Sequence, residues 1–325
     1  MKSQSRNPKS GLGRDRIEPA PGEVRLSGPV FRLVHWLLMM CLAELDARSF
    51  GENARIEASS PPARIATKPV AGKTLVPRLT AQAATSQAEF CAAICDALPR
   101  VPMESGVFQD PDSPGKSMRY RLFKPTPLAP TNTYPLTVFL HGGGARRSFG
   151  DLLKCASPVF AFGPARLVAP AEQARHPAFV LVPWSGGRDW DDENTRLIVV
   201  LLDTLRLELP IDPKRLYVTG QSMGGYGTWR MITRHPDLFA AGVPVCGGGD
   251  PAAAPKAKDV SVWAFHGAAD GIVPVSETRR IIDALLRAGS KPIYWEYESG
   301  THAGTAKRAY CETGLLDWLF AQTKM

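Results

Sequence analysis

The sequence predicts an α/β fold in which a mostly parallel sheet carries helices on both faces. From about residue 101 onward, short apolar runs alternate with amphipathic helical patterns, which is typical of repeated strand–helix units. Several runs, such as YPLTVFL at 134–140, are apolar throughout, as expected for strands buried on both faces. The composition, 44% hydrophobic and 22% charged, is that of a soluble globular protein.

The individual elements follow from these patterns. SMRYRLFKP alternates like a half-buried strand and stops at Pro125. Further strands are expected at 134–140, 178–184, 215–220, 240–248, 260–267 and 291–298. Helices are expected between them, at 149–162, 192–208, 224–235, 276–289 and 306–322. The acidic run at 191–193 stands where a helix begins and favours capping over a pair of catalytic carboxylates.

The N-terminal third differs in composition and lacks the alternation of strand and helix patterns. Residues 1–43 are expected to be a signal peptide or an N-terminal extension, because the apolar run at 30–43 follows a basic region and ends in small residues. That run is too short for a stable transmembrane span. The long, partly acidic segment before it leaves an amphipathic helix as the alternative. We expect export to the periplasm or the medium, with the cytoplasm as alternative. Residues 44–100 read as a low-complexity, disordered linker, and 101–325 as the folded domain.

Charge and cysteine usage exclude some classes of function. The net charge is +8, but residues 1–100 hold 14 basic and 9 acidic residues, so most of the excess lies there. No basic run with interleaved aromatics indicates nucleic-acid binding. The six cysteines are read as packing residues or disulfides, and no Cys/His cluster has metal-ligand spacing, so no metal is expected. The oligomeric state cannot be predicted from these patterns.

The stretch YVTGQSMGGYGTW places Ser222 between an apolar strand and a helical pattern. Gly220-Gln-Ser222-Met-Gly224 matches G-x-S-x-G, a weak pattern alone in a chain with 29 glycines. Its strand–turn–helix setting is what a nucleophile elbow requires, because the turn raises the hydroxyl above the sheet. Ser222 is therefore the candidate nucleophile.

A serine nucleophile needs an oriented base. Asp270 opens the loop after the strand VSVWAFHG, and His302 lies in the loop after KPIYWEYE. The order Ser222, Asp270, His302 is the order of serine, acid and histidine expected for this architecture. His302 would take the proton of Ser222, and Asp270 would fix the imidazole tautomer.

Donors for an oxyanion are expected from backbone amides. Met223 N–H follows the nucleophile, and Gly143 N–H in FLHGGGARR supplies a second donor, with Gly144 beside it. Trp184 and Trp190 follow the strand AFVLVPW and are candidates for lining a substrate pocket, with core packing as the alternative.

The stretches YPLTVFLHGGGARR, RLYVTGQSMGGYGTW, PDLFAAGVPVCGGGD and VWAFHGAADGIVPV resemble the α/β-hydrolase superfamily. They are similar to the predicted-peptidase and esterase group related to polyhydroxybutyrate depolymerases and feruloyl esterases. The resemblance implies an α/β-hydrolase catalytic domain at 101–325 that hydrolyses esters through an acyl-enzyme without a cofactor. The resemblance also implies that Ser222, Asp270 and His302 are the catalytic triad. Relatives often have a tryptophan after the histidine, whereas this chain reads HAGTA.

Three classes of function occur on a fold of this kind. A carboxylic-ester hydrolase acting on a small-molecule or polymeric ester is the expectation. A serine peptidase with the same triad is the alternative. A non-catalytic binding protein on this fold is disfavoured, because the serine, acid, histidine and glycine loop are all intact.

Overall fold

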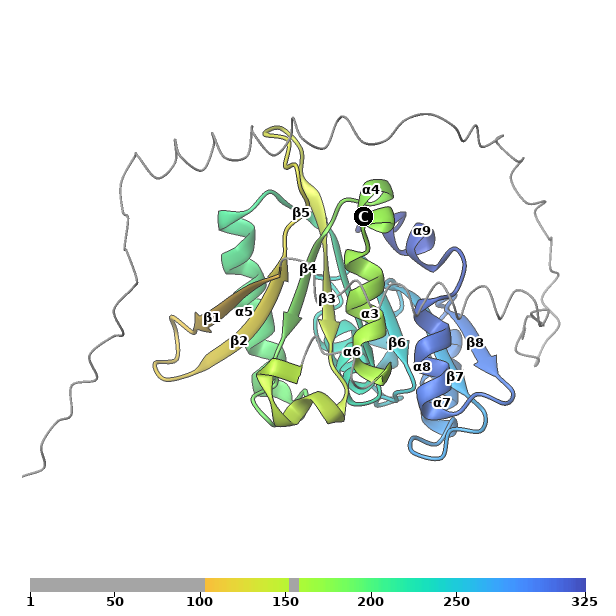
Figure 1. Cartoon of the computed structure of the whole chain (residues 1–325). Helices are drawn as coiled ribbons and strands as arrows, with labels where there is room; N and C mark the ends of the chain where they lie inside the picture. Colours follow the sequence, from red (N-terminus) through yellow and green to blue (C-terminus); the bar gives the residue numbers. More distant parts are fainter. Residues whose placement is uncertain (1–102, 152–157) are drawn as a thin grey trace, which may run out of the picture. The chain divides into compact units, whose positions relative to one another are not determined.

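The computed structural model describes residues 103–151 and 158–325, with side chains from 103 to 150 and from 163 onward. The predicted N-terminal extension at 1–43 and linker at 44–100 lie outside the described residues. The fold is built on one eight-stranded sheet (Figure 1). Its strands are β1 (Glu104–Gln109), β2 (Ser117–Phe123), β3 (Tyr134–Leu140), β4 (Phe179–Pro183), β5 (Ile211–Gln221), β6 (Ala241–Val245), β7 (Ser261–Gly267) and β8 (Ile293–Tyr297).

The strand order is β1-β2-β4-β3-β5-β6-β7-β8. The pairs β1–β2 and β2–β4 are antiparallel, and every later pair is parallel. The parallel strands therefore end at one edge of the sheet, where the loops after β3, β5, β7 and β8 meet. Ligand sites in open α/β sheets form at this carboxyl edge.

Helices cover both faces of the sheet. They are α3 (Pro158–Val168), α4 (Pro170–Arg175), α5 (Asp192–Glu208), α6 (Met223–Arg234), α7 (Ser276–Arg287), α8 (His302–Tyr310) and α9 (Leu315–Phe320). One buried cluster joins the sheet to α3, α8 and α9, and a second joins it to α5, α6 and α7. Adjacent strand residues divide between the two: Tyr217 belongs to the first cluster and Val218 to the second. The apolar strands are thus buried on both faces, as predicted.

The expected α/β fold is confirmed, with differences at a few elements. The strand β1 was not predicted, since ESGVFQ exposes most of its residues at the edge of the sheet. The predicted helix at 149–162 appears as a short 3-10 turn at Phe149–Asp151 and α3 from Pro158. The predicted helix at 306–322 is two helices, because Gly314 adopts a left-handed φ of 82° that interrupts an α-helix. Within 103–151 and 158–325, no helix has both the length and the hydropathy needed to span a membrane.

Candidate active site

Ser222 occupies a strained bend between β5 and α6. Its φ of 57° and ψ of −121° lie in a region that non-glycine residues rarely adopt. Such strain persists only where the surrounding structure imposes it, and it concentrates at functional sites. The bend gives Ser222 the geometry of a nucleophile elbow.

The glycines around Ser222 allow backbone segments to approach closely. A Cβ added at Gly224 would lie 1.9 Å from the carbonyl oxygen of Leu140, and one at Gly220 would lie 2.5 Å from the same atom. A Cβ at Gly225 would lie 2.5 Å from the carbonyl oxygen of Val245. The three glycines therefore pack the elbow against the ends of β3 and β6. The Ser222 N–H also donates to the Val245 carbonyl at 2.8 Å.

His302 and Asp270 meet at the carboxyl edge of the sheet. Asp270 lies in the loop after β7, and His302 begins α8 after the β8 loop. The His302 Nδ1 atom lies 2.6 Å from Asp270 Oδ2. Because the carboxylate accepts, Nδ1 carries the proton and Nε2 is left with a lone pair. This is the tautomer that a general base needs.

The Asp270 carboxylate is buried but well supplied with donors. Its side chain is 0% exposed, and Oδ1 accepts the N–H groups of Ile272 and Val273, each at 2.9 Å. Burial alone would raise the pKa of Asp270, yet the hydrogen bonds from His302 and from the two amides outweigh it and lower that pKa. Asp270 is therefore ionised at neutral pH and can stabilise an imidazolium.

A second histidine also faces this carboxylate. His266, at the end of β7, is fully buried and places Nε2 3.0 Å from the Val273 carbonyl oxygen and 3.3 Å from Asp270 Oδ2. Its Nδ1 lies 2.7 Å from Thr278 Oγ1. Burial lowers the pKa of His266, so the neutral ring donates from Nε2. These contacts make His266 a support for the Asp270 carboxylate.

The thiol of Cys246 lies beside these groups. Cys246, His266 and Asp270 place potential metal-ligand atoms within 4.8 Å of one another. Burial is the main cause that raises the pKa of the Cys246 thiol above its usual range, and the Asp270 carboxylate raises it further. A protonated thiol is a poor metal ligand, and Asp270 and His266 are engaged in hydrogen bonds. The cluster therefore suits a hydrogen-bond network better than a metal ion.

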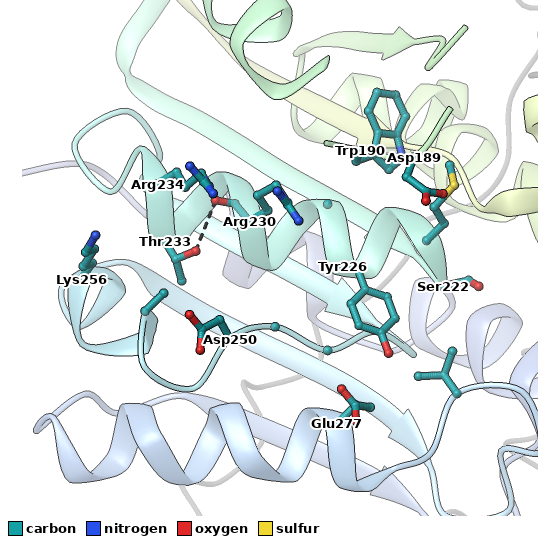
Figure 2. Close-up of a pocket in the computed structure, with 16 residues that line it drawn as sticks. Asp189, Trp190, Ser222, Tyr226, Arg230, Thr233, Arg234, Asp250, Lys256 and Glu277 are labelled. Atoms are coloured by element: carbon teal, nitrogen blue, oxygen red, sulfur yellow. Dashed lines mark hydrogen bonds between the residues drawn. The ribbon is translucent and has the colours of Figure 1, made fainter. Parts of the chain in front are cut away.

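The Ser222 hydroxyl makes no hydrogen bond within the described part of the chain. Catalytic hydrogen bonds are often long or unaligned before substrate binds. The residue borders a cavity of about 810 Å³ (Figure 2), which gives a substrate access to it. Ser222, Asp270 and His302 follow β5, β7 and β8 on the same edge of the sheet.

The two expected oxyanion donors are available. Among residues 103–151 and 158–325, neither the Gly143 amide nor the Met223 amide donates a hydrogen bond to the protein. Gly143 begins the 3-10 turn Gly143–Arg147 after β3, and Met223 begins α6. A Cβ built at Gly143 would meet no atom within 4 Å, so the space beside it is open. Gly144, its neighbour, is exposed.

His141 holds the peptide that contains the Gly143 amide. Its Nε2 accepts the Ser185 N–H at 3.2 Å, which places the proton on Nδ1, and Nδ1 donates to the Gly142 carbonyl at 2.9 Å. The carbonyl of Gly142 and the N–H of Gly143 share one planar peptide and point in opposite directions. Fixing the carbonyl therefore aims the amide. Burial lowers the pKa of His141 to about 4, so the ring stays neutral.

The two tryptophans differ in position. Trp190 borders the cavity although it is only 3% exposed, and its indole N–H donates to the His141 carbonyl at 3.0 Å. Trp184 is not among the residues around this cavity. It packs edge-on against Phe149, and its indole donates to the Ala145 carbonyl. Trp190 therefore both borders the cavity and supports the loop after β3 that carries Gly143.

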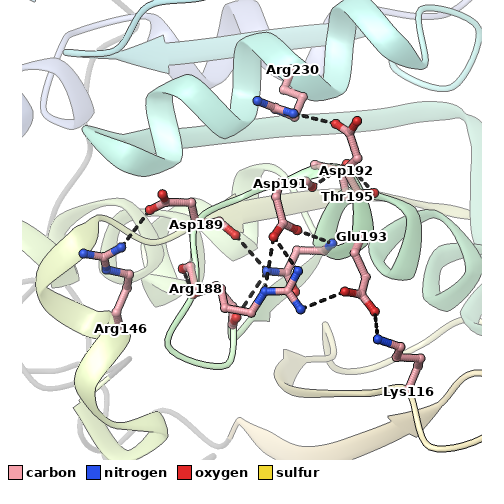
Figure 3. Close-up of polar contacts among 11 residues, drawn as sticks. Lys116, Arg146, Arg188, Asp189, Asp191, Asp192, Glu193, Thr195 and Arg230 are labelled. Atoms are coloured by element: carbon pink, nitrogen blue, oxygen red, sulfur yellow. Dashed lines mark hydrogen bonds and ion pairs between the residues drawn. The ribbon is translucent and has the colours of Figure 1, made fainter.

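The loop between β4 and α5 is held by ion pairs (Figure 3). Asp191 caps α5 by accepting the Asn194 N–H at 2.9 Å, which confirms the predicted capping role of this acidic run. Arg188 pairs with Asp191 at 2.5 Å and with Glu193 at 2.7 Å. This network fixes the loop that carries Trp190 toward the cavity.

Sequence reasoning missed the polar side chains around the cavity. Besides Ser222, Met223 and Trp190, the cavity is bordered by charged and hydroxyl groups from the β4–α5 loop, from α6, from the loop after β6 and from the start of α7: Asp189, Tyr226, Arg230, Thr233, Arg234, Asp250, Lys256 and Glu277. A signal was present in α6, where polar residues recur at helical spacing. This spacing does not by itself predict a cavity, because the neighbouring loops decide which face of α6 stays open.

Comparison with known proteins finds similarity to peptidases and to enzymes named for ester substrates. A model of the prolyl oligopeptidase family matches residues 185–264. Poly(3-hydroxyalkanoate) depolymerase C of Paucimonas lemoignei is 29% identical over 133 residues, which cover 39% of this chain and 31% of the depolymerase. The bifunctional acetylxylan esterase/xylanase XynS20E of Neocallimastix patriciarum is 32% identical over 102 residues, covering 29% of this chain and 15% of that protein. The chain thus spans less than a third of these relatives.

The structural comparison agrees with the sequence comparison. The crystal structure of a thermostable esterase superimposes with a TM-score of 0.63 at 34% sequence identity, covering 71% of this chain and 64% of the esterase. The mostly parallel eight-stranded sheet with helices on both faces is the α/β-hydrolase architecture. The chain therefore has the α/β-hydrolase fold and is similar to esterase and peptidase members of that superfamily.

Proposed function

We propose that this protein is a serine hydrolase that cleaves carboxylic esters through an acyl-enzyme intermediate. The observation that carries the proposal is the 2.6 Å contact between His302 Nδ1 and Asp270 Oδ2, on the same edge of the sheet as the strained Ser222. The assignment to esters is supported by the names of three similar proteins: a polyester depolymerase, an acetylxylan esterase and a thermostable esterase.

In the first half of the proposed reaction, Ser222 Oγ attacks the ester carbonyl carbon and its proton passes to His302 Nε2. The carbonyl oxygen becomes an oxyanion, which accepts hydrogen bonds from the Gly143 and Met223 amides. Collapse of the tetrahedral intermediate breaks the bond to the alcohol oxygen. His302 returns the proton to that oxygen, so the alcohol leaves and the acyl group stays on Ser222.

In the second half, a water molecule repeats the chemistry. His302 Nε2 takes a proton from the water as its oxygen attacks the acyl carbon. Collapse of the second intermediate releases the carboxylic acid and returns the proton to Ser222. Asp270, ionised because its hydrogen bonds lower its pKa, stabilises the imidazolium in both halves.

The direct test is hydrolysis of p-nitrophenyl acetate. We expect the purified protein to release p-nitrophenol and Ser222→Ala to lower kcat by at least about 10³-fold, because single triad residues contribute effects of that size. Equal rates in the wild type and the variant would exclude the mechanism.

A serine peptidase with the same three residues is the second candidate. The match of residues 185–264 to the prolyl oligopeptidase family favours it. Release of p-nitroaniline from peptide p-nitroanilides at rates comparable to ester hydrolysis would support the peptidase. Ester hydrolysis without amide cleavage would support the esterase.

We also propose that the protein is exported. Cys311 is disulfide-bonded, and disulfides persist in oxidising compartments. N-terminal sequencing of the mature protein tests this, and an intact Met1 on protein recovered only from the cytoplasm would contradict it.

A further inference from the structure

The cavity that contains Ser222 runs along one face of α6 (Figure 2). The residues that α6 contributes are spaced three or four apart, so they form a single stripe: Met223, Tyr226, Gly227, Arg230, Thr233 and Arg234. The twelve residues of α6, from Met223 to Arg234, extend about 18 Å at the rise of an α-helix. A bound substrate can therefore reach well beyond the bond that is cleaved.

The walls of this cavity carry charged side chains of both signs. Three cationic residues, Arg230, Arg234 and Lys256, border it, together with three acidic ones, Asp189, Asp250 and Glu277. An apolar chain lying here would remove water from these groups without replacing their hydrogen bonds, at about 1–3 kcal/mol for each group. These six charged side chains favour a substrate with polar groups over a long aliphatic chain.

The far end of the cavity has a pre-organised pair of guanidinium groups. Arg230 and Arg234 both bind Asp192, with Nη1–Oδ1 and Nη2–Oδ2 distances of 2.5 and 3.0 Å. One carboxylate therefore holds two guanidiniums one turn apart and neutralises only one of the two charges. Each guanidinium keeps further N–H donors, and both side chains are partly exposed.

Lys256 adds a third positive charge at this end, opposite α6 (Figure 2). Within the described ranges its ammonium forms no ion pair. Asp250 is the cavity-lining carboxylate at this end, and its Oδ1 accepts the Ala252 N–H, while Asp192, outside the cavity lining, is shared by the two arginines. The far end therefore has three cations against two carboxylates and suits an anionic group.

We propose that the alcohol part of the natural ester is a carbohydrate chain that bears a carboxylate. In this arrangement the acylated hydroxyl lies at Ser222, and Arg234 and Lys256 bind the carboxylate of a uronic acid residue farther along the chain. Sugar hydroxyls both donate and accept, which matches the carboxylates and cationic donors along the walls. No strand edge borders the cavity among the described residues, so a peptide would find no backbone ladder there. This inference rests on the proposed ester hydrolysis and specifies its substrate.

The test compares two acetylated xylo-oligosaccharides that differ only in one glucuronic acid substituent. We expect the wild type to show at least a tenfold higher kcat/KM for the acidic substrate, a preference that weakens as salt screens the charges. Arg234→Ser and Lys256→Ser should each bring the ratio of the two kcat/KM values toward one. Lys258→Ser, an exposed lysine two residues from Lys256 that does not border the cavity, should retain the wild-type ratio.

The outcomes separate this inference from the proposed function. Hydrolysis of p-nitrophenyl acetate with a ratio near one in the wild type would overturn the carbohydrate inference and leave the esterase standing. A wild-type ratio that survives in both variants would also overturn it. Failure to cleave any of the three esters would overturn both proposals. Because Lys256 is exposed and has no ion pair among the described residues, its variant should fold even if loss of Arg234 disturbs α6.

Discussion

His302 and Asp270 are 32 residues apart, yet His302 Nδ1 lies 2.6 Å from Asp270 Oδ2, inside the fold rather than at its surface. Their meeting follows from topology, since β7 and β8 are adjacent and parallel and their following loops leave the same edge of the sheet. The contact orients the imidazole, with Nδ1 facing the carboxylate.

Asp270→Asn should keep the contact and lose most of the activity. The amide would donate to Nδ1, forcing the His302 proton onto Nε2, where it blocks acceptance of the serine proton. We expect kcat for p-nitrophenyl acetate to fall by about 10⁴-fold with a small change in KM. An unchanged kcat would show that Asp270 does not act on His302.

Gly143→Ala should lower activity without unfolding the protein. A Cβ at Gly143 meets no protein atom within 4 Å, so the methyl group would occupy only space that the substrate carbonyl needs. We expect kcat/KM to fall by about 10²-fold or more, the size of a lost oxyanion donor, with the melting temperature nearly unchanged.

Gly224→Ala is the contrasting variant, because its Cβ would lie 1.9 Å from the backbone oxygen of Leu140. We expect a large fall in melting temperature there. If Gly143→Ala instead lost stability and kept its activity, the placement of the oxyanion hole would be wrong.

His141→Gln should reduce the sensitivity of folding to mild acid. Burial lowers the pKa of His141 from 6.5 to about 4, so the unfolded chain binds a proton more readily than the folded protein does. Its contribution to stability is therefore present above pH 6.5 and is lost as the pH falls toward 4, by about 2 kcal/mol between pH 7.5 and 5.

Urea denaturation of the wild type and of His141→Gln at these two pH values checks the prediction. The wild type should lose more of its free energy of unfolding than the variant. Equal losses would mean that His141 is protonated in the folded protein.

Much of the fold could be predicted because its strands are locally apolar and its helices are locally periodic. The β3 run and the helix α5 were placed with the bounds that the structure has. The edge strand β1 was missed because an exposed strand lacks an apolar run. The break at Gly314 was also missed, because one glycine in a helical pattern does not reveal its φ.

For the candidate site, the nucleophile elbow could be predicted from its local motif. The order of serine, acid and histidine could be predicted because the loops after parallel strands leave the same edge of the sheet. Two features could not. His266 supports Asp270 through a contact that depends on how the β7 loop folds back. The cationic end of the cavity depends on Asp192 of α5 reaching across to Arg230 and Arg234 of α6.

The most direct measurement is covalent labelling with a serine-reactive fluorophosphonate, followed by mass spectrometry of the peptide that carries Ser222. The account predicts one label per chain on Ser222, with no labelling and no ester hydrolysis in Ser222→Ala. Labelling at another serine, or full hydrolysis of p-nitrophenyl acetate by Ser222→Ala, would contradict it.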